Sequence, residues 1–162
     1  MKIVDGKEVD RDILLKLRNE LWPHHGIKAL QQQISDLMSS NDEFLYVGFE
    51  GDSPVGFIEL KIRDSAPGSD NARVPYLEGW CVSPSYRNRG YGRRLVAFAE
   101  RWAKEQGYRV LASDTTTRYP GSIEAHKAIG FKEVKTVHDS PAKRWRILTV
   151  SMMCYAAANV AE

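Results

Sequence analysis

The sequence predicts a single α/β (α+β) domain with a mixed, mostly antiparallel sheet of six to seven strands and about four helices. Its 162 residues suit one domain with a substantial core. Strand-like and helix-like segments follow in the order strand, two helices, three strands, helix, strand, helix and two strands. No internal repeat, low-complexity segment or linker interrupts this order, so we expect residues 1–162 to form one domain.

The N-terminal part is predicted to be helical after a short strand at residues 2–4. Asp10 or Asp12 can cap a first helix with apolar residues on one face, and Pro23 ends that helix. A second amphipathic helix is expected from about Ala29.

Three strands are predicted next. Residues 43–49 and 54–62 are rich in β-branched and aromatic residues and are joined by turn residues, which indicates an antiparallel hairpin. The third strand, 76–82, contains Gly79, which suggests a β-bulge. The connecting segment 63–74 is rich in Ser, Asp, Asn, Pro and Gly, so it is either a substrate-facing loop or merely a mobile one.

A glycine-rich loop follows the third strand and leads directly into a helix that begins near Tyr91 and ends before Gly107. Gly90 and Gly92 let backbone N–H groups crowd around an anion, at the positive end of the helix dipole. Four arginines strengthen this prediction of a phosphate or pyrophosphate site: Arg87, Arg89, Arg93 and Arg94. The alternative is an arginine-rich, solvated turn before an ordinary helix.

The C-terminal part is predicted to contain a short buried strand at 109–113 that ends at Asp114. Ser122 can cap a helix that runs through Ile129 and ends at Gly130. Segments 131–138 and 144–153 then have the pattern of a closing hairpin.

The composition limits the kinds of partner that we expect the protein to bind. Twenty-three basic and 21 acidic residues leave a net charge of +2, which is too small to predict general nucleic-acid binding. The two cysteines, Cys81 and Cys154, lack metal-ligand spacing, so we expect neither a metal site nor a disulfide framework. No apolar run is long enough to span a bilayer, and we expect a cytoplasmic protein without a membrane partner.

The loop pattern Arg87-x-x-Gly90-x-Gly92 resembles the acetyl-coenzyme A signature of the GCN5-related N-acetyltransferase superfamily. Within that superfamily, five spaced segments resemble the aminoglycoside 6′-N-acetyltransferases: 17–23, 57–63, 76–79, 112–115 and 126–131. The resemblance implies the superfamily's fold, acetyl-CoA as co-substrate, and acetyl transfer to the 6′-amino group of aminoglycosides by direct attack.

The resemblance also implies which residues hold the cofactor. The strand backbone would pair with the pantetheine, and the loop with Tyr119 would contact the rest of coenzyme A. The predicted cofactor-binding residues are Trp80, Cys81, Val82, Arg87, Asn88, Arg89, Gly90, Tyr91, Gly92, Arg93 and Tyr119. The neighbours of Cys81 supply no activating base, so we do not expect it to be a nucleophile.

Glu78 and Asp114 are the candidate catalytic carboxylates. An ammonium cannot attack a thioester, so the enzyme must bind a cationic amine and remove a proton, and carboxylates do both. In the alternative, Glu78 caps the backbone at the bulge and Asp114 caps the following loop. By resemblance, Trp22 and His25 would also contact the substrate. His126 would either protonate the leaving thiolate or simply pack or contact coenzyme A.

The chain departs from the family pattern on the substrate rim, notably at residues 65–68, at Lys135 and at Tyr119. Two alternatives therefore stay open: acetylation of a polyamine, small amine or protein amine, or a coenzyme A-binding module without catalysis. The family commonly pairs through strands near its C-terminus, and the apolar run 147–155 leads us to expect a homodimer; the alternative is that this run is buried inside one subunit.

Overall fold

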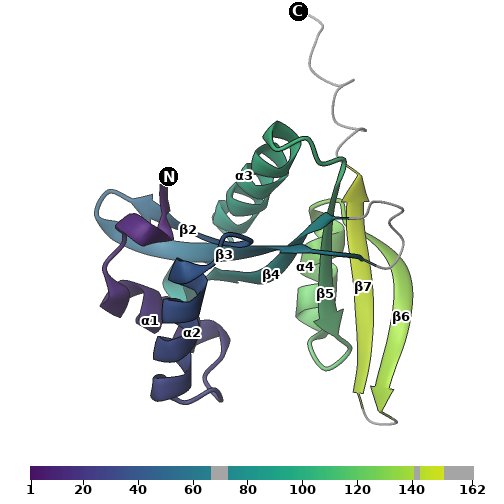
Figure 1. Cartoon of the computed structure of the whole chain (residues 1–162), viewed down its shortest axis with the longest axis horizontal. Coiled ribbons are helices and arrows are strands. Elements are labelled where there is room, and N and C mark those ends of the chain that lie inside the picture. The colour runs from purple at the N-terminus through teal and green to yellow at the C-terminus, as the bar shows by residue number, and fades with distance from the viewer. Residues whose placement is uncertain (67–72, 141–142, 152–162) are drawn as a thin grey trace, which may run out of the picture. The chain divides into compact units, whose positions relative to one another are not determined.

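The computed structural model describes residues 1–66, 73–140 and 143–151. In these ranges it contains seven strands and four α-helices in the predicted order (Figure 1). The elements are β1 (Lys2–Asp5), α1 (Arg11–Leu21), α2 (Ile27–Ser39), β2 (Glu43–Glu50), β3 (Ser53–Arg63), β4 (Val74–Val82), α3 (Tyr91–Glu105), β5 (Val110–Thr116), α4 (Pro120–Ala128), β6 (Lys132–Ser140) and β7 (Lys143–Ser151). Short 3₁₀ helices, η1 (Gly6–Glu8) and η2 (Pro84–Tyr86), follow β1 and β4.

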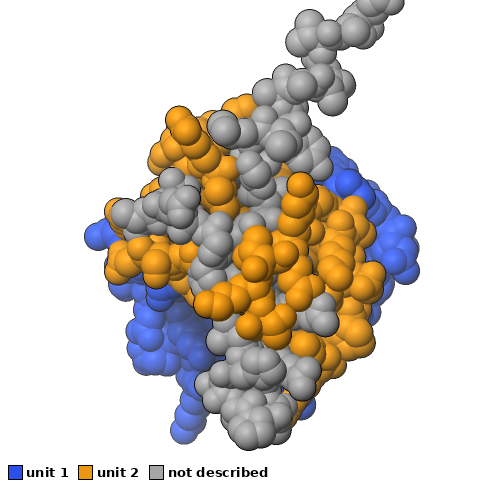
Figure 2. All heavy atoms as spheres, turned by 90° about the vertical axis from the view of Figure 1, so that its right-hand side faces the viewer, with its two compact units in different colours: residues 1–61, 77–98 blue, residues 62–76, 99–162 orange. Residues whose placement is uncertain are grey.

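The chain divides into two compact units, coloured separately in Figure 2. Unit 1 consists of residues 1–61 and 77–98, and unit 2 of residues 62–76 and 99–162. The elements β3, β4 and α3 each contribute residues to both units.

Unit 1 contains antiparallel β1, β2 and β3, with β4 beside β3. Asp10 caps α1, because its Oδ1 accepts the Asp12 N–H at 2.8 Å. Helices α1 and α2 bury one apolar face each, and Leu14, Ile34 and Phe57 lie in the shared core with residues of the strands. Amphipathic periodicity therefore predicted correctly which sides of both helices are buried.

A buried ion pair lies inside unit 1. Arg18 of α1 is paired with Glu59 of β3, and both side chains are almost completely inaccessible. Nη2 of Arg18 also donates to Oε1 of Gln33 on α2 at 2.8 Å. Burial lowers the pKa of Arg18 to about 10, an effect that the charge of Glu43 partly opposes. Arg18 therefore stays protonated at neutral pH and ties α1 to both α2 and β3.

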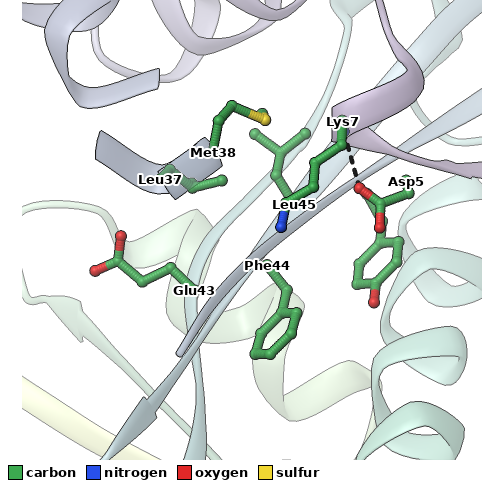
Figure 3. Close-up of a pocket in the computed structure, with 8 residues that line it drawn as sticks. Asp5, Lys7, Leu37, Met38, Glu43, Phe44 and Leu45 are labelled. Atoms are coloured by element: carbon green, nitrogen blue, oxygen red, sulfur yellow. Dashed lines mark hydrogen bonds between the residues drawn. The ribbon is translucent and has the colours of Figure 1, made fainter. Parts of the chain in front are cut away.

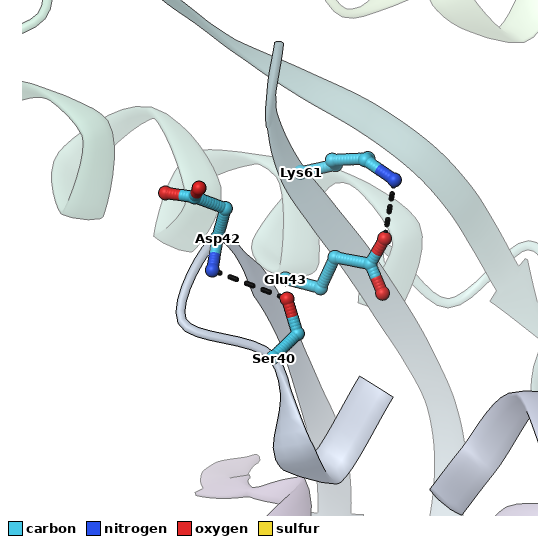
Figure 4. A network of polar contacts seen from close by, with 4 residues as sticks. All are labelled: Ser40, Asp42, Glu43 and Lys61. Atoms are coloured by element: carbon cyan, nitrogen blue, oxygen red, sulfur yellow. Dashed lines mark hydrogen bonds and ion pairs between the residues drawn. The ribbon is translucent and has the colours of Figure 1, made fainter. Parts of the chain in front are cut away.

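A second, exposed ion pair joins β2 and β3 near the turn between α2 and β2 (Figure 4). Nζ of Lys61 pairs with Glu43, and 46% of the lysine side chain is exposed. The Asp42 N–H donates to Oγ of Ser40 at 3.2 Å and shapes the connecting turn. This network is a solvent-exposed counterpart to the buried Arg18–Glu59 pair.

Unit 2 contains β5, β7 and β6, which pair antiparallel in that order. The register places Asp114 opposite Ile147, and Lys135 opposite the same residue on the other side of β7. Leu111 and Ala112 of β5 are fully buried, and Ile123 and Phe131 are almost fully buried. The predicted closing hairpin is therefore confirmed as far as Ser151; its last two predicted residues lie outside the described ranges.

Two predicted boundaries in unit 2 are wrong. Strand β5 continues to Thr116, so Asp114 lies within the strand and does not cap a following loop. Helix α4 begins at Pro120, which has no N–H to leave unsatisfied at a first helical position. Ser122 is consequently inside the helix, and its Oγ accepts from the hydroxyl of Thr115 at 3.0 Å.

The described part of the chain contains no helix that is long and apolar enough to cross a membrane.

We predict that Arg18→Met lowers the free energy of unfolding by about 3 kcal/mol, because it leaves Glu59 as an uncompensated buried charge. Chemical denaturation measures the loss. The matched control Lys61→Met breaks the exposed pair with Glu43 and should cost less than about 1 kcal/mol. Equal costs for the two variants would contradict the assignment of a buried pair.

Candidate active site

The glycine-rich loop enters α3 with backbone geometry that suits an anion. Asn88 and Gly90 have positive φ angles of 61° and 80°, and a Cβ at Gly90 would meet nothing within 4 Å. The Arg94 N–H donates to the Gly90 carbonyl at 3.1 Å, so the helical hydrogen bonds begin there. The N–H groups of Tyr91, Gly92 and Arg93, which come before this first helical bond, therefore lie at the positive end of the helix.

The loop is fixed by a contact that the sequence did not reveal. The hydroxyl of Tyr91, a buried side chain, donates to the carboxylate of Glu50 at the end of β2. This hydrogen bond raises the pKa of Tyr91. The Tyr91 ring also meets the edge of Tyr86 at 6.1 Å. The predicted turn residue Glu50 therefore holds the start of α3.

The arginines of the loop differ in their contacts. Nε of Arg87 donates to the carbonyl of Val82 at 3.0 Å, so this side chain is bound to the end of β4. Arg89 lies over the ring of Tyr86, 5.7 Å from its centroid. Arg93 is exposed. The shared phosphate site stays a prediction for all four arginines.

Two glycines, one in α3 and one in β4, lie against tryptophan side chains. A Cβ at Gly92 would lie 2.9 Å from Cζ2 of Trp80, and a Cβ at Gly79 would lie 2.8 Å from Cη2 of Trp22. Both distances are shorter than a real Cβ tolerates, so each glycine makes room for a tryptophan. The close approach of Trp22 gives Gly79 a packing reason, while the bulge expected there stays a prediction.

Cys81 is buried in β4, with 6% of its surface exposed. Burial, with a smaller contribution from Glu20, raises the pKa of the thiol, although Arg87 acts in the opposite direction. A thiol that keeps its proton is a poor nucleophile, which supports the expectation that Cys81 is not a nucleophile.

Trp22 and His25 lie together just after α1. Their rings stack with a 7° interplanar angle and a centroid distance of 6.0 Å. The guanidinium of Arg18 lies 4.7 Å from the centroid of the Trp22 ring, so the tryptophan is supported from α1. Trp22 is half-buried and His25 is exposed, which leaves an aromatic surface open to solvent. Glu78, also in unit 1, is half-buried in β4.

Asp114 in unit 2 has two partners that the sequence did not predict. Its Oδ2 accepts a hydrogen bond from the Tyr76 hydroxyl at 3.0 Å. Nη1 of Arg63 lies 3.6 Å from the same oxygen, and the guanidinium stacks over the Tyr76 ring at 3.5 Å. The Asp114 side chain is 31% exposed, so it is positioned and still reachable.

His126 is buried in α4 with both ring nitrogens engaged. Nδ1 lies 2.7 Å from the carbonyl of Ser122, which can only accept, so Nδ1 carries the proton. Nε2 lies 2.9 Å from Oγ of Ser113 and accepts from it. The ring also meets the edge of Phe131 at 5.2 Å. Burial lowers the pKa of His126, which keeps the imidazole neutral.

Tyr119 precedes α4, and 60% of it is exposed. The predicted rim segment 65–68 lies partly outside the described residues, as does the apolar run 147–155. A hollow of about 150 Å³ in unit 1 involves none of the predicted site residues (Figure 3). It is lined by Asp5, Lys7, Leu37, Met38, Glu43, Phe44, Leu45 and Tyr46.

Comparison with known proteins connects this geometry to one family. Residues 11–131 match the model of the acetyltransferase (GNAT) family. Aminoglycoside N(6′)-acetyltransferase type 1 of Klebsiella aerogenes is 38% identical over 128 residues, which cover 76% of this chain and 84% of the relative. The enzyme of the same name from Salmonella typhimurium strain LT2 is 34% identical over 122 residues, covering 75% and 84%.

A solved structure is similar to this chain as well. AAC(6′)-Iy in complex with the bisubstrate analogue CoA-S-monomethyl-acetylneamine is similar with a TM-score of 0.80 and 30% identity, covering 86% of this chain and 95% of that one. The matched family segment includes β4, the glycine-rich loop and α3, together with β5 and α4. The chain therefore belongs to the acetyltransferase (GNAT) family, and the relatives named here are aminoglycoside N(6′)-acetyltransferases.

Proposed function

We propose that this protein transfers the acetyl group of acetyl-CoA to the 6′-amino group of aminoglycoside antibiotics and thereby confers resistance. The observation that carries the proposal is the likeness to AAC(6′)-Iy, whose structure holds an analogue that joins coenzyme A to an acetylated aminoglycoside. The Klebsiella and Salmonella relatives carry the same activity in their names.

The cofactor part rests on the loop before α3. The open left-handed backbone at Asn88 and Gly90 and the helix N–H groups suit the pyrophosphate of coenzyme A. The exposed side chains of Arg89 and Arg93 add positive charge. The backbone of β4 from Trp80 to Val82 is proposed to pair with the pantetheine, while Arg87 secures the end of that strand.

The chemical part rests on the carboxylates. The amine reaches the enzyme as an ammonium, so a proton must leave before nitrogen attacks the thioester carbonyl carbon. Asp114 or Glu78 takes that proton, directly or through water. As the new C–N bond forms, the nitrogen gives up a second proton, the C–S bond breaks, and the thiolate accepts a proton and leaves as the thiol. The Cys81 or a neighbouring N–H is proposed to polarise the thioester carbonyl.

His126 is not proposed as the donor of that last proton. Its only N–H points to the Ser122 carbonyl, and its other nitrogen accepts from Ser113. We propose that it packs α4 against β5. Trp22 and His25 are proposed to form an aromatic wall of the substrate site, where a ring face suits a cationic sugar.

We further propose that residues 1–162 act as one acetyltransferase domain, that the protein is cytoplasmic, and that it pairs as a homodimer through strands near its C-terminus. Neither nucleic acid, membrane nor metal ion has a place in the proposed activity.

We predict that the purified protein acetylates kanamycin and tobramycin faster than polyamines or peptides, and that expression in a sensitive bacterium raises resistance to both drugs. Coupled detection of free thiol across an amine panel measures this preference. If the protein acetylates other amines and does not raise resistance, its substrate is another amine and not an antibiotic. Binding of acetyl-CoA without any turnover would instead indicate a coenzyme A-binding module.

We predict that acetyl-CoA raises the melting temperature of the wild type by mass action, whereas NAD and ATP do not. Gly90→Asp should abolish this shift, because it introduces a carboxylate and a side chain at a φ of 80°. Gly107→Asp is the matched control, since Gly107 has a φ of 85° but ends α3 away from the loop. An acetyl-CoA shift that survives in Gly90→Asp would show that the loop has been misread.

We predict that Asp114→Asn lowers turnover or raises the aminoglycoside KM at least about tenfold, equivalent to roughly 1.4 kcal/mol, with little change in acetyl-CoA affinity. Asparagine keeps an oxygen for the Tyr76 hydroxyl, so the substitution removes charge and basicity rather than shape. Steady-state kinetics with each substrate varied in turn measure the effect. Equal losses toward both substrates would argue for a general structural defect.

A further inference from the structure

Within unit 1, strand β2 and helix α3 pack against each other at matched positions. The ring of Tyr46 meets the ring of Phe98 edge-on, with 4.7 Å between the centroids. Two residues further along β2, a Cβ at Gly48 would lie 3.3 Å from Cδ2 of Leu95. Alternate residues of a strand share a face, and so do helix residues spaced three or four apart. The next matched pair therefore lies where β2 ends and α3 begins.

That next pair is polar. Tyr91, the first residue of α3, is 6% exposed, and its hydroxyl donates to Oε2 of Glu50, the last residue of β2. A hydrogen bond to an ionised carboxylate is stronger than one between neutral groups. The Tyr86 ring meets the Tyr91 ring edge-on with the centroids 6.1 Å apart, so the loop contacts the same side chain. The end of β2 therefore fixes the first turn of α3.

The position of this carboxylate is unexpected beside an anion site. The hydrogen bond to Glu50 raises the pKa of Tyr91, whereas the charges of Arg89 and Arg94 oppose the rise. The carboxylate therefore shares its surroundings with arginines of the glycine-rich loop. A negative charge at this place weakens the binding of an anion to the loop. Repulsion by Glu50 and alignment of α3 through Tyr91 thus have opposite effects on anion affinity.

We propose that Glu50 is a positioning residue of the coenzyme A site, because it holds through Tyr91 the backbone N–H groups that bind the pyrophosphate. The inference rests on the proposed function, since it takes the loop before α3 as that site. The free N–H groups of a first helical turn bind one anion together only when their directions are fixed. A helix start that is fixed before binding spares the complex the cost of ordering it. The alignment contributes more to affinity than the charge of Glu50 removes.

Calorimetric titration with coenzyme A tests the proposal. Glu50→Ala and Tyr91→Phe each break the hydrogen bond, and each should raise the Kd at least about fivefold. The double variant should bind little more weakly than the single variants, because both changes remove the same bond. Glu50→Gln keeps an oxygen that accepts from Tyr91, so it should bind at least as tightly as the wild type.

Asp52→Ala is the matched control, since it removes an exposed carboxylate from the turn that follows β2. It should leave the Kd unchanged or lower it, because only charge is lost. If Glu50→Ala also binds as tightly as the wild type or more tightly, repulsion is the larger effect and the inference is overturned. The same holds if Glu50→Gln binds as weakly as Glu50→Ala. Tyr91→Phe breaks the bond from the other side and decides the matter if Glu50→Ala does not fold.

A shortened acetyl donor separates positioning from a general structural defect. S-acetylpantetheine carries the thioester but no pyrophosphate. In Tyr91→Phe, kcat/KM should fall at least about fivefold with acetyl-CoA, through its KM, and stay within about twofold of the wild type with S-acetylpantetheine. Equal losses with both donors overturn the inference and leave the proposed function intact. A wild type that does not bind coenzyme A overturns both, whereas binding without turnover removes only the acetyl transfer and leaves the Kd values to decide the inference.

Discussion

The close approach of glycine backbone to bulky groups around β4 is the constraint on which the candidate site depends. A Cβ at Gly56 would come within 2.3 Å of the Cys81 carbonyl oxygen, and similar clashes would occur at Gly79 with Trp22 and at Gly92 with Trp80. Gly56 of β3 and Gly92 of α3 therefore approach β4 closely only because they lack a side chain, and Gly79 of β4 leaves the space that Trp22 occupies. Any substitution at these glycines moves either the strand proposed to bind pantetheine or the tryptophan proposed to line the substrate site.

Charge is distributed according to burial. Arg18 and Glu59 are nearly inaccessible and hold α1 against β3. The guanidinium of Arg18 also lies over the ring of Trp22. Arg63 and Asp114 are about one-third exposed and offer their polar atoms to solvent. The buried pair is a structural element because breaking it leaves a charge without water. The exposed pair suits ligand exchange because its members are never far from solvent.

The sequence predicted most of the secondary structure because its signals are local. The Asp10 cap, the helix stop at Gly107 and the glycines of the loop each depend on neighbouring residues. The pairing of Tyr91 with Glu50 and of Asp114 with Tyr76 joins residues 41 and 38 positions apart, and no local pattern encodes such contacts. The family-like segment 112–115 predicted Asp114 as a catalytic carboxylate, whereas only the structure shows its partners.

The environment of His126 favours one of the two roles that the sequence left open. A general acid must hold a proton that it can release toward the leaving group. The imidazole is neutral, its one N–H donates to the Ser122 carbonyl, and Ser113 donates to its other nitrogen. Protonating Nε2 would break the bond from Ser113 and place a charge in a buried site beside Phe131. These contacts support the proposal that His126 stabilises the junction of α4 with β5 and that the thiolate takes its proton from another group or from water.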